Sequence, residues 1–198
     1  MRRIALTGGI ATGKTYVRQQ FEKLGVPTSD ADTRAREAVA PGTEGFAAVV
    51  RAFGPDILEP SGVLDRKRLA GVVFSDPDAR RRLEAIIHPA VQHATDQWFA
   101  SLDASRHSMA IADIPLLYEV GRDRDFDEVI VVATDPGIQL RRVMERDGVT
   151  EDEARQRLAA QLPIEEKVRR ADYVIRTDGT FEDTNRQVRE VYERLASR

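Results

Sequence analysis

The sequence predicts an α/β protein in which a mainly parallel sheet carries helices on both faces. Short apolar segments, each typical of a buried strand, alternate with segments that have helical periodicity. The clearest strands are Arg3–Thr7, Glu128–Ala133 and Asp172–Arg176. Strands that are apolar along their whole length are typical of a parallel sheet covered on both sides.

Two weaker strands and a helical middle complete the predicted order. Val26–Ser29 follows the break at Gly25, and Met109–Ile114 has the pattern of a buried strand. Further helices are expected in the following segments: Tyr16–Leu24, most of Thr33–Arg106, Gly137–Arg146, Thr150–Ala160 and Phe181–Ala196.

Local signals predict where some of these helices begin. Ser75-Asp76-Pro77 is a helix start, and the pattern behind it reaches about Ser105. We expect Pro89 to bend or split that helix, because proline removes a backbone donor and its ring clashes with the preceding turn. Thr150 and Glu153 have the spacing of a capping box.

The composition excludes several classes of protein. The chain has 198 residues, of which 41% are hydrophobic, so it can bury a sizeable core. Its formal net charge of −3 argues against a general nucleic-acid binder. Cysteine is absent, which excludes disulfides and thiolate chemistry. The spacing of the three histidines, His88, His93 and His107, indicates no zinc site.

No signal for a membrane or for secretion is present. No run reaches the roughly 18 apolar residues of a membrane span. The basic start Met1-Arg2-Arg3 lacks the apolar segment of a signal peptide. We therefore expect a cytoplasmic protein that binds neither membrane nor nucleic acid and is a monomer or a weak homo-oligomer.

The segment Leu6–Thr15, "LTGGIATGKT", matches the P-loop pattern, with a predicted strand before it and a helix after it. Glycines allow successive backbone N–H groups to point inward and form an anion-binding nest. The new helix adds unpaired N–H groups and its positive dipole end. Lys14 is expected to hold the β- and γ-phosphates of ATP, and the Thr15 hydroxyl to bind Mg²⁺.

The alternative is a glycine-rich turn with an incidental lysine. The flanking strand and helix favour nucleotide binding over that alternative. The residues expected to contact ATP are Gly8, Gly9, Ala11, Thr12, Gly13, Lys14, Thr15 and Tyr16.

Among P-loop proteins, a small-molecule kinase is the leading class. The chain has no Asn-Lys-x-Asp motif to read guanine and no Asp-x-x-Gly switch motif, which argues against a GTPase. It is also short for a mechanical ATPase. A non-catalytic nucleotide-binding regulator remains an alternative.

Three carboxylates are expected at the carboxyl ends of the strands, where ligands bind in open parallel sheets. Asp30 and Asp32 follow the second strand, and Asp113 ends the third. Phosphoryl transfer needs a carboxylate near the acceptor hydroxyl and others near Mg²⁺. Asp32 is the candidate base and Asp113 the candidate acid near Mg²⁺. Asp30 could equally cap the next helix, and Asp113 could be a solvated strand end.

With the segments "DAD", "IIHP" and "DIPLLYE" added to the P-loop, the sequence resembles the dephospho-CoA kinase family over essentially its whole length. The resemblance implies ATP-dependent phosphorylation of the ribose 3′-hydroxyl of dephospho-CoA, the last step of coenzyme A synthesis. Its substrates would be ATP and dephospho-CoA, with Mg²⁺. A related nucleoside or nucleotide kinase is the alternative within the same fold.

The resemblance also implies three regions. The P-loop kinase core would comprise about 1–32, 107–136 and 171–198. A helical acceptor-binding insert would comprise about 33–106, and a small helical lid about 137–170.

Residue roles follow from the same resemblance. Asp32 would be the general base, and Arg142 and Arg146 the lid arginines that approach the phosphates. Arg142 and Arg146 are four residues apart and share a helix face, although a solvated basic face would have the same spacing. The other acceptor-side residues would be His88, Pro115, Leu116, Leu117 and Glu119. A purely structural role for His88 is the alternative.

The chain departs from the family pattern inside the P-loop. Ala11-Thr12 stands where Gly-Ser is common, and Tyr16 stands where a small hydroxyl residue is usual. A Cβ at position 11 requires a compatible φ, so we expect a slightly different nest geometry there.

Overall fold

Strand β1 (Arg2–Gly8) occupies the centre of a five-stranded sheet within the part of the chain that the structure describes. This computed structural model describes residues 1–103 and 106–197, and gives no side chains for Ala31, Asp32 and Ser75. The strand order is β2-β3-β1-β4-β5. β1 pairs in parallel with β3 (Met109–Asp113) and β4 (Glu128–Ala133). The predicted parallel sheet is confirmed.

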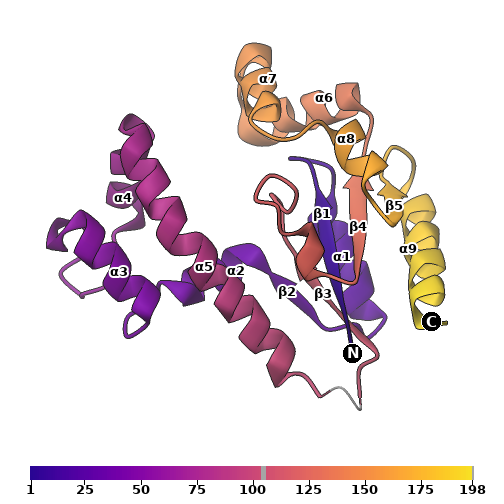
Figure 1. The fold of residues 1–198 in the computed structure, drawn as a ribbon. Helices are drawn as coiled ribbons and strands as arrows, with labels where there is room; N and C mark the ends of the chain where they lie inside the picture. The colour runs from indigo at the N-terminus through magenta and orange to yellow at the C-terminus, as the bar shows by residue number, and fades with distance from the viewer. Residues whose placement is uncertain (104–105, 198) are drawn as a thin grey trace. The chain divides into compact units, whose positions relative to one another are not determined.

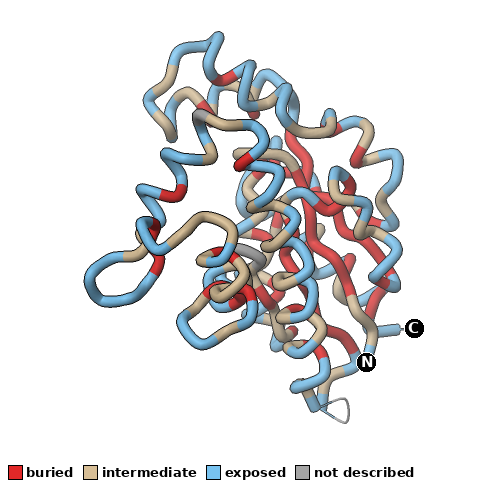
Figure 2. The backbone as a smooth tube through the Cα atoms, turned by 60° about the vertical axis from the view of Figure 1, so that its left-hand side comes forward, coloured by how far each residue is buried: buried red, intermediate tan, exposed pale blue. Residues whose placement is uncertain are grey.

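The two edge strands complete this sheet. β5 (Tyr173–Arg176) pairs in parallel with β4, and β2 (Thr28–Asp30) lies beside β3. All five strands lie within one or two residues of the predicted segments. The tube drawing shows several of these strands in red, the colour of buried residues (Figure 2).

Both faces of the sheet are covered, which explains why its strands are apolar along their length. On one face, Ile4, Leu6 and Ile130 join a core that includes side chains from α1 (Lys14–Lys23) and α9 (Phe181–Ala196). Successive strand residues point to opposite faces. The residues between them, such as Ala5 and Val131, are also fully buried.

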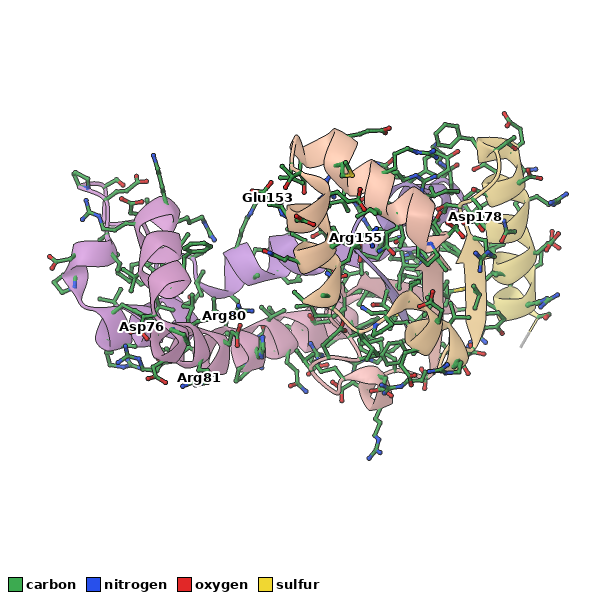
Figure 3. All side chains as sticks on the ribbon, turned by 90° about the horizontal axis from the view of Figure 1, so that it is seen from above. Asp76, Arg80, Arg81, Glu153, Arg155 and Asp178 are labelled. Atoms are coloured by element: carbon green, nitrogen blue, oxygen red, sulfur yellow. The ribbon has the colours of Figure 1, made fainter. Side chains whose placement is uncertain are left out.

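The helices of the sheet unit follow their local signals. In α1, Val17 and Phe21 are four residues apart and both are fully buried. α6 (Pro136–Asp147) begins with the Asp135 side chain accepting bonds from two backbone N–H groups. α7 (Glu151–Ala159) begins with the predicted Thr150–Glu153 capping box. Glu153 is labelled in Figure 3 on this helix. The short helix α8 (Ile164–Arg169) was not predicted.

The chain divides into two units, which are described separately. The first contains Met1–Ser29 and Leu102–Arg198, and the second contains Asp30–Ser101. The first therefore holds the sheet together with α6, α7 and α8 (Figure 1). It also holds the short 3₁₀ helix η2 (Asp123–Asp125).

The second unit is helical, as predicted. It contains α2 (Ala31–Ala38), α3 (Glu44–Phe53), η1 (Pro55–Ile57), α4 (Arg66–Ser75) and α5 (Pro77–Ser101). Its own core includes Val49, Ile57, Leu64 and Leu69, packed against partly buried side chains of α5. No helix in the described residues is long and apolar enough to cross a membrane.

Helix α5 decides between the two alternatives expected at Pro89, a split helix and a continuous one. It runs from Pro77 to Ser101 with Pro89 inside it, so Pro89 does not split the helix. A 25-residue helix has many other backbone bonds and side-chain contacts with which to absorb one lost hydrogen bond. Asp76, Arg80 and Arg81 lie at its beginning (Figure 3), where the Asp76 side chain accepts a bond from the Asp78 N–H.

Candidate functional site: the P-loop cavity

The P-loop lies between the end of β1 and the start of α1, where sequence analysis placed it. Gly13 has φ 82° and directly precedes α1. A Cβ on Gly8 would lie 2.5 Å from the Val132 carbonyl oxygen of the neighbouring strand. Glycine is therefore required at position 8 by close packing and at position 13 by its left-handed backbone.

Ala11 adopts a conformation that favours glycine. Its φ is 58°, the only positive φ of a non-glycine residue among the described residues. The expectation of an altered nest geometry at this position rested on a Cβ avoiding this region. The structure places Ala11 in this left-handed region, where its Cβ carries a steric cost.

A cavity of about 680 Å³ lies over this loop. Its lining includes seven of the eight residues predicted to bind ATP; of these eight, only Tyr16 is outside it. Pro115, from the segment after β3, lines the cavity as well, as do Arg142, Glu145 and Arg146 from α6. The structure thus brings the P-loop and both predicted lid arginines to one cavity within the first unit.

Lys14 and Asp113 are in direct contact at the base of this site. The ammonium and carboxylate form an ion pair, and Asp113 is 3% exposed. Arg18, one turn further along α1, places its Nε 3.6 Å from the other Asp113 oxygen. Asp113 is thus a buried acid between two cations rather than a solvated strand end. Sequence reasoning missed Arg18, although the i, i+4 spacing from Lys14 marks it as a neighbour.

Arg142 and Arg146 are each held by a neighbouring group. Arg142 donates to the Thr177 hydroxyl at 3.1 Å and to the Thr177 carbonyl at 2.8 Å. The Thr177 hydroxyl donates to the Thr12 carbonyl of the P-loop at 2.8 Å. Arg146 donates twice to Asp147, and the bond from Arg146 holds the pKa of the Asp147 carboxyl below its usual range.

Two glutamines hold Ile10, the outermost part of the P-loop. Gln139 of α6 donates its side-chain N–H to the Ile10 carbonyl at 2.7 Å. Gln161, which follows α7, accepts the Ile10 N–H at 2.9 Å. Neither glutamine is among the site residues predicted from the sequence. In the sequence, the only sign of these contacts is that Gln139 lies near the beginning of the predicted lid and Gln161 near its end.

A second cavity of about 490 Å³ lies beside the first and shares Ala11, Gly13 and Arg142 with it. Tyr16 lines this second cavity together with Phe181, and their ring centroids are 4.8 Å apart. The Tyr16 hydroxyl donates to the Asn185 side chain at 2.9 Å. Phe181 is 67% exposed. The unusual tyrosine therefore belongs to an aromatic wall.

The segment after β3 differs in part from the expected acceptor-side surface. Pro115 lines the P-loop cavity and Leu116 is exposed, but Leu117 is fully buried. Leu117 therefore cannot line an open site, because the turn after β3 directs its side chain into the interior. Glu119 is not a free acid: its carboxylate is 2.7 Å from the Lys167 ammonium and accepts the Leu162 N–H at 3.0 Å.

The remaining predicted residues belong to the second unit. The side chain of Asp32 lies outside the described part of the chain, and its backbone is the second residue of α2. His88 is exposed on α5. A cavity of about 920 Å³ within this unit is lined by side chains including Pro89, His93 and Trp98. His93 was noted in the sequence only as an argument against zinc.

The geometry alone describes a polyanion site: a P-loop nest, a lysine and two arginines around one cavity. Comparison with known proteins narrows this to one family. The family model for dephospho-CoA kinase matches residues 2–183. The chain belongs to the dephospho-CoA kinase family. Its activity is dephospho-CoA kinase activity, the final step of coenzyme A biosynthesis, as the sequence resemblance predicted.

Individual relatives support this assignment over most of the chain. A dephospho-CoA kinase of Anaeromyxobacter dehalogenans is 51% identical over 182 residues, which covers 92% of this chain and 86% of the relative. A solved protein of Thermus thermophilus is 34% identical, covers 98% of this chain and 97% of its own, and has a TM-score of 0.81. The dephospho-CoA kinase of Campylobacter jejuni is 26% identical, with coverage of 98% and 97% and a TM-score of 0.77.

Proposed function

We propose that the 680 Å³ cavity over the P-loop holds the triphosphate of ATP while its γ-phosphoryl group passes to the ribose 3′-hydroxyl of dephospho-CoA. The observation that carries this proposal is the convergence of Lys14, Arg142 and Arg146 on one cavity whose floor is the P-loop. Phosphoryl transfer spreads negative charge over three oxygens in the transition state. Preorganised cations around those oxygens are the main way in which a protein can lower that barrier.

Lys14 is proposed to bind the β- and γ-phosphates, which requires it to exchange the Asp113 carboxylate for phosphate oxygens. Arg18 lies near the same carboxylate, so Asp113 keeps a cationic neighbour when Lys14 turns to the phosphates. The exchange therefore does not leave a buried carboxylate without a cation, a situation that would be costly.

Arg142 and Arg146 are proposed to stabilise the phosphates from α6. Both are held in place by hydrogen bonds, Arg142 to Thr177 and Arg146 to Asp147. Arginine suits this role because its planar guanidinium can contact two phosphate oxygens at once. Thr177 links Arg142 to the P-loop carbonyl of Thr12, so the P-loop helps to orient the Arg142 guanidinium through Thr177.

The second cavity is proposed to take the nucleobase of ATP. It adjoins the phosphate cavity at Ala11, Gly13 and Arg142, and Tyr16 and Phe181 form an aromatic wall there. Aromatic faces and an arginine guanidinium are surfaces on which a purine ring stacks well.

The residues at this site fit a magnesium ion bound with ATP. Mg²⁺ prefers oxygen ligands and is commonly held by one or two protein groups together with phosphates. Thr15 offers a hydroxyl at the start of α1, and Asp113 a carboxylate at the end of β3. The ion would neutralise charge on the phosphates. Among the described side chains, no group of three or more His, Cys, Asp or Glu residues could hold a metal by itself.

Asp32 is proposed as the general base that accepts the proton of the 3′-hydroxyl. The second unit, which contains Asp32 and His88, is proposed to bind the acceptor. On the acceptor side of the first unit we propose Pro115 and Leu116. Glu119 is proposed to act there indirectly, through its ion pair with Lys167. We place the reaction in the cytoplasm, in a monomer or weak homo-oligomer that binds neither membrane nor nucleic acid.

The test is a coupled ADP-release assay with Mg-ATP in which dephospho-CoA, adenosine and no acceptor are compared. We expect release that depends on dephospho-CoA, with coenzyme A as the product. Faster turnover with adenosine than with dephospho-CoA would show that the acceptor is a nucleoside. Equal ADP release with and without an acceptor would overturn the proposed phosphoryl transfer to dephospho-CoA. Omission of Mg²⁺ in the presence of EDTA should abolish release.

A further inference from the structure

Lys167 is a fully buried lysine in the first unit. It lies on α8, and its side chain is 0% exposed. Burial of an ammonium group is costly unless a counter-charge and hydrogen bonds compensate for the lost water. Its position therefore requires partners, and they come from segments that are far apart in the sequence.

Each of the three N–H donors of the ammonium has a partner. The Lys167 Nζ is 2.7 Å from the Glu119 carboxylate, 3.2 Å from the Pro115 carbonyl oxygen and 3.3 Å from the Gly8 carbonyl oxygen. A lysine ammonium has three donors and no acceptor. This set therefore satisfies it completely, with one charged and two neutral acceptors.

Two of these partners border the phosphate cavity. Gly8 is the first residue of the P-loop pattern, and Pro115 lines the same cavity from the segment after β3. The Pro115 carbonyl also accepts a bond from the Thr7 hydroxyl at 3.2 Å. Lys167 thus holds the backbone on two sides of the cavity at a fixed separation.

The third partner connects this contact to the segment between α7 and α8. Glu119 accepts the N–H of Leu162, and the preceding residue, Gln161, accepts the N–H of Ile10 in the P-loop. One hydrogen-bonded network therefore joins the P-loop, the segment after β3 and residues 161–167.

We propose that Lys167 is a positioning residue for phosphoryl transfer: it fixes the P-loop at Gly8 and the cavity wall at Pro115, and adds a positive charge behind the phosphates. This inference rests on the proposed ATP site. Lys167 does not line the cavity, and its action passes through the backbone that does and through its charge.

Electrostatics supports a link to the phosphate site. Burial lowers the pKa of Lys167, the bond to Glu119 acts in the opposite direction, and the charge of Lys14 lowers the pKa further. The two ammonium groups are thus close enough to repel each other. A polyphosphate that binds at Lys14 will relieve this repulsion, so the charge of Lys167 will favour polyphosphates over uncharged nucleosides.

A purely structural ion pair is the competing explanation. Replacement of a buried ion pair by apolar groups of similar size is often neutral or stabilising. A structural role would change thermal stability without a specific effect on phosphate binding. A positioning role would change kcat and the affinity for polyphosphates, and leave the affinity for adenosine unchanged.

The test compares Lys167→Met, which keeps an unbranched side chain of similar size without the ammonium group, with the wild type and with Lys23→Met as a matched control. Lys23 is exposed at the end of α1. We would measure kcat, the KM for ATP, the melting temperature, and the Kd values of ADP and adenosine. We expect Lys167→Met to lower kcat and weaken ADP binding by about tenfold each, the loss expected for a charged hydrogen bond. Adenosine affinity should be unchanged, and Lys23→Met should match the wild type in every measurement.

A folded Lys167→Met protein with wild-type kcat and ADP affinity would overturn the proposal. If that variant does not fold, Glu119→Gln keeps the buried lysine but neutralises its partner. It should lower kcat several-fold without a change in adenosine affinity; wild-type kcat would then overturn the proposal. The Kd of ADP is measured without an acceptor, so this readout, unlike kcat, is independent of whether the wild type uses dephospho-CoA.

Discussion

The Lys14 ammonium lies against the Asp113 carboxylate at the point where two paired strands, β1 and β3, end side by side. Their side chains are 14% and 4% exposed, so water screens the attraction between the two charges only weakly. This contact keeps Lys14, the lysine proposed to bind phosphate, extended toward the end of the sheet. If Lys14 binds the phosphates as proposed, an incoming nucleotide competes with Asp113 for it.

Replacement of Lys14 by alanine should remove a charge that acts on the transferring group. We expect Lys14→Ala to lower kcat/KM by about 10²-fold or more, because a few kcal/mol of transition-state stabilisation are lost. Steady-state kinetics with Mg-ATP and dephospho-CoA would measure this. Lys67→Ala, in the second unit, is the control. Near-normal turnover of Lys14→Ala would contradict the P-loop assignment.

Asp113→Asn separates two proposed roles of this carboxylate, as the partner of Lys14 and as a ligand of Mg²⁺. Without the competing charge, Lys14 should bind ADP at least as tightly as in the wild type when EDTA is present. With Mg²⁺, kcat should fall by about 10²-fold, because a ligand of the ion and a partner of two cations are lost. Calorimetric titration with ADP in EDTA and in Mg²⁺ would check this. Weaker ADP binding in EDTA would show that Asp113 chiefly supports the loop.

Ala11→Gly should stabilise the protein. The left-handed backbone at Ala11 costs about 1–2 kcal/mol with a Cβ, and the added freedom of glycine in the unfolded chain offsets about 0.4–1 kcal/mol. A net gain of between about 0 and 1.6 kcal/mol in the free energy of unfolding is expected. Ala154→Gly, inside α7, should instead lose about 1 kcal/mol. Urea unfolding of both variants provides the comparison. A clear loss of stability in Ala11→Gly would contradict backbone strain at Ala11.

Arg142→Lys should show that the planar guanidinium matters, and not only the charge. Lysine cannot reproduce the paired bonds to the Thr177 hydroxyl and carbonyl. We expect kcat/KM for ATP to fall by about tenfold or more. The adjacent Arg141 is exposed, and Arg141→Lys should match the wild type. Equal kinetics for the two variants would assign Arg142 to a solvated face.

Asp32→Asn tests the proposed base. The variant should fold and bind ATP normally but lose most of kcat, because the amide cannot accept the proton of the acceptor hydroxyl. Binding of ADP and single-turnover kinetics would separate the two effects. A collapse of ATP affinity with kcat retained would make Asp32 a metal-binding or structural residue.

Signals contained in a few neighbouring residues made parts of the fold predictable. Strand β4 and helix α9 have the predicted bounds, and the Thr150 capping box forms as expected. The P-loop was recognisable because its geometry depends on the spacing of Gly8, Gly13 and Lys14 along one turn. The burial of Leu117 was not predicted, and the choice between a split and a continuous α5 at Pro89 was left open, since both depend on what packs around those residues.

The sequence by itself determined the order of strands and helices, the anion-binding loop and, through its family resemblance, the reaction. These depend on local periodicity and on residue types at fixed spacing. Only the tertiary structure decided that Asp113 pairs with Lys14, that Thr177 orients Arg142, and that Lys167 is buried beneath the P-loop with Glu119. A side chain chooses such partners by proximity in space and by the cost of leaving a buried charge unpaired, and neither is encoded in the spacing of residues along the chain.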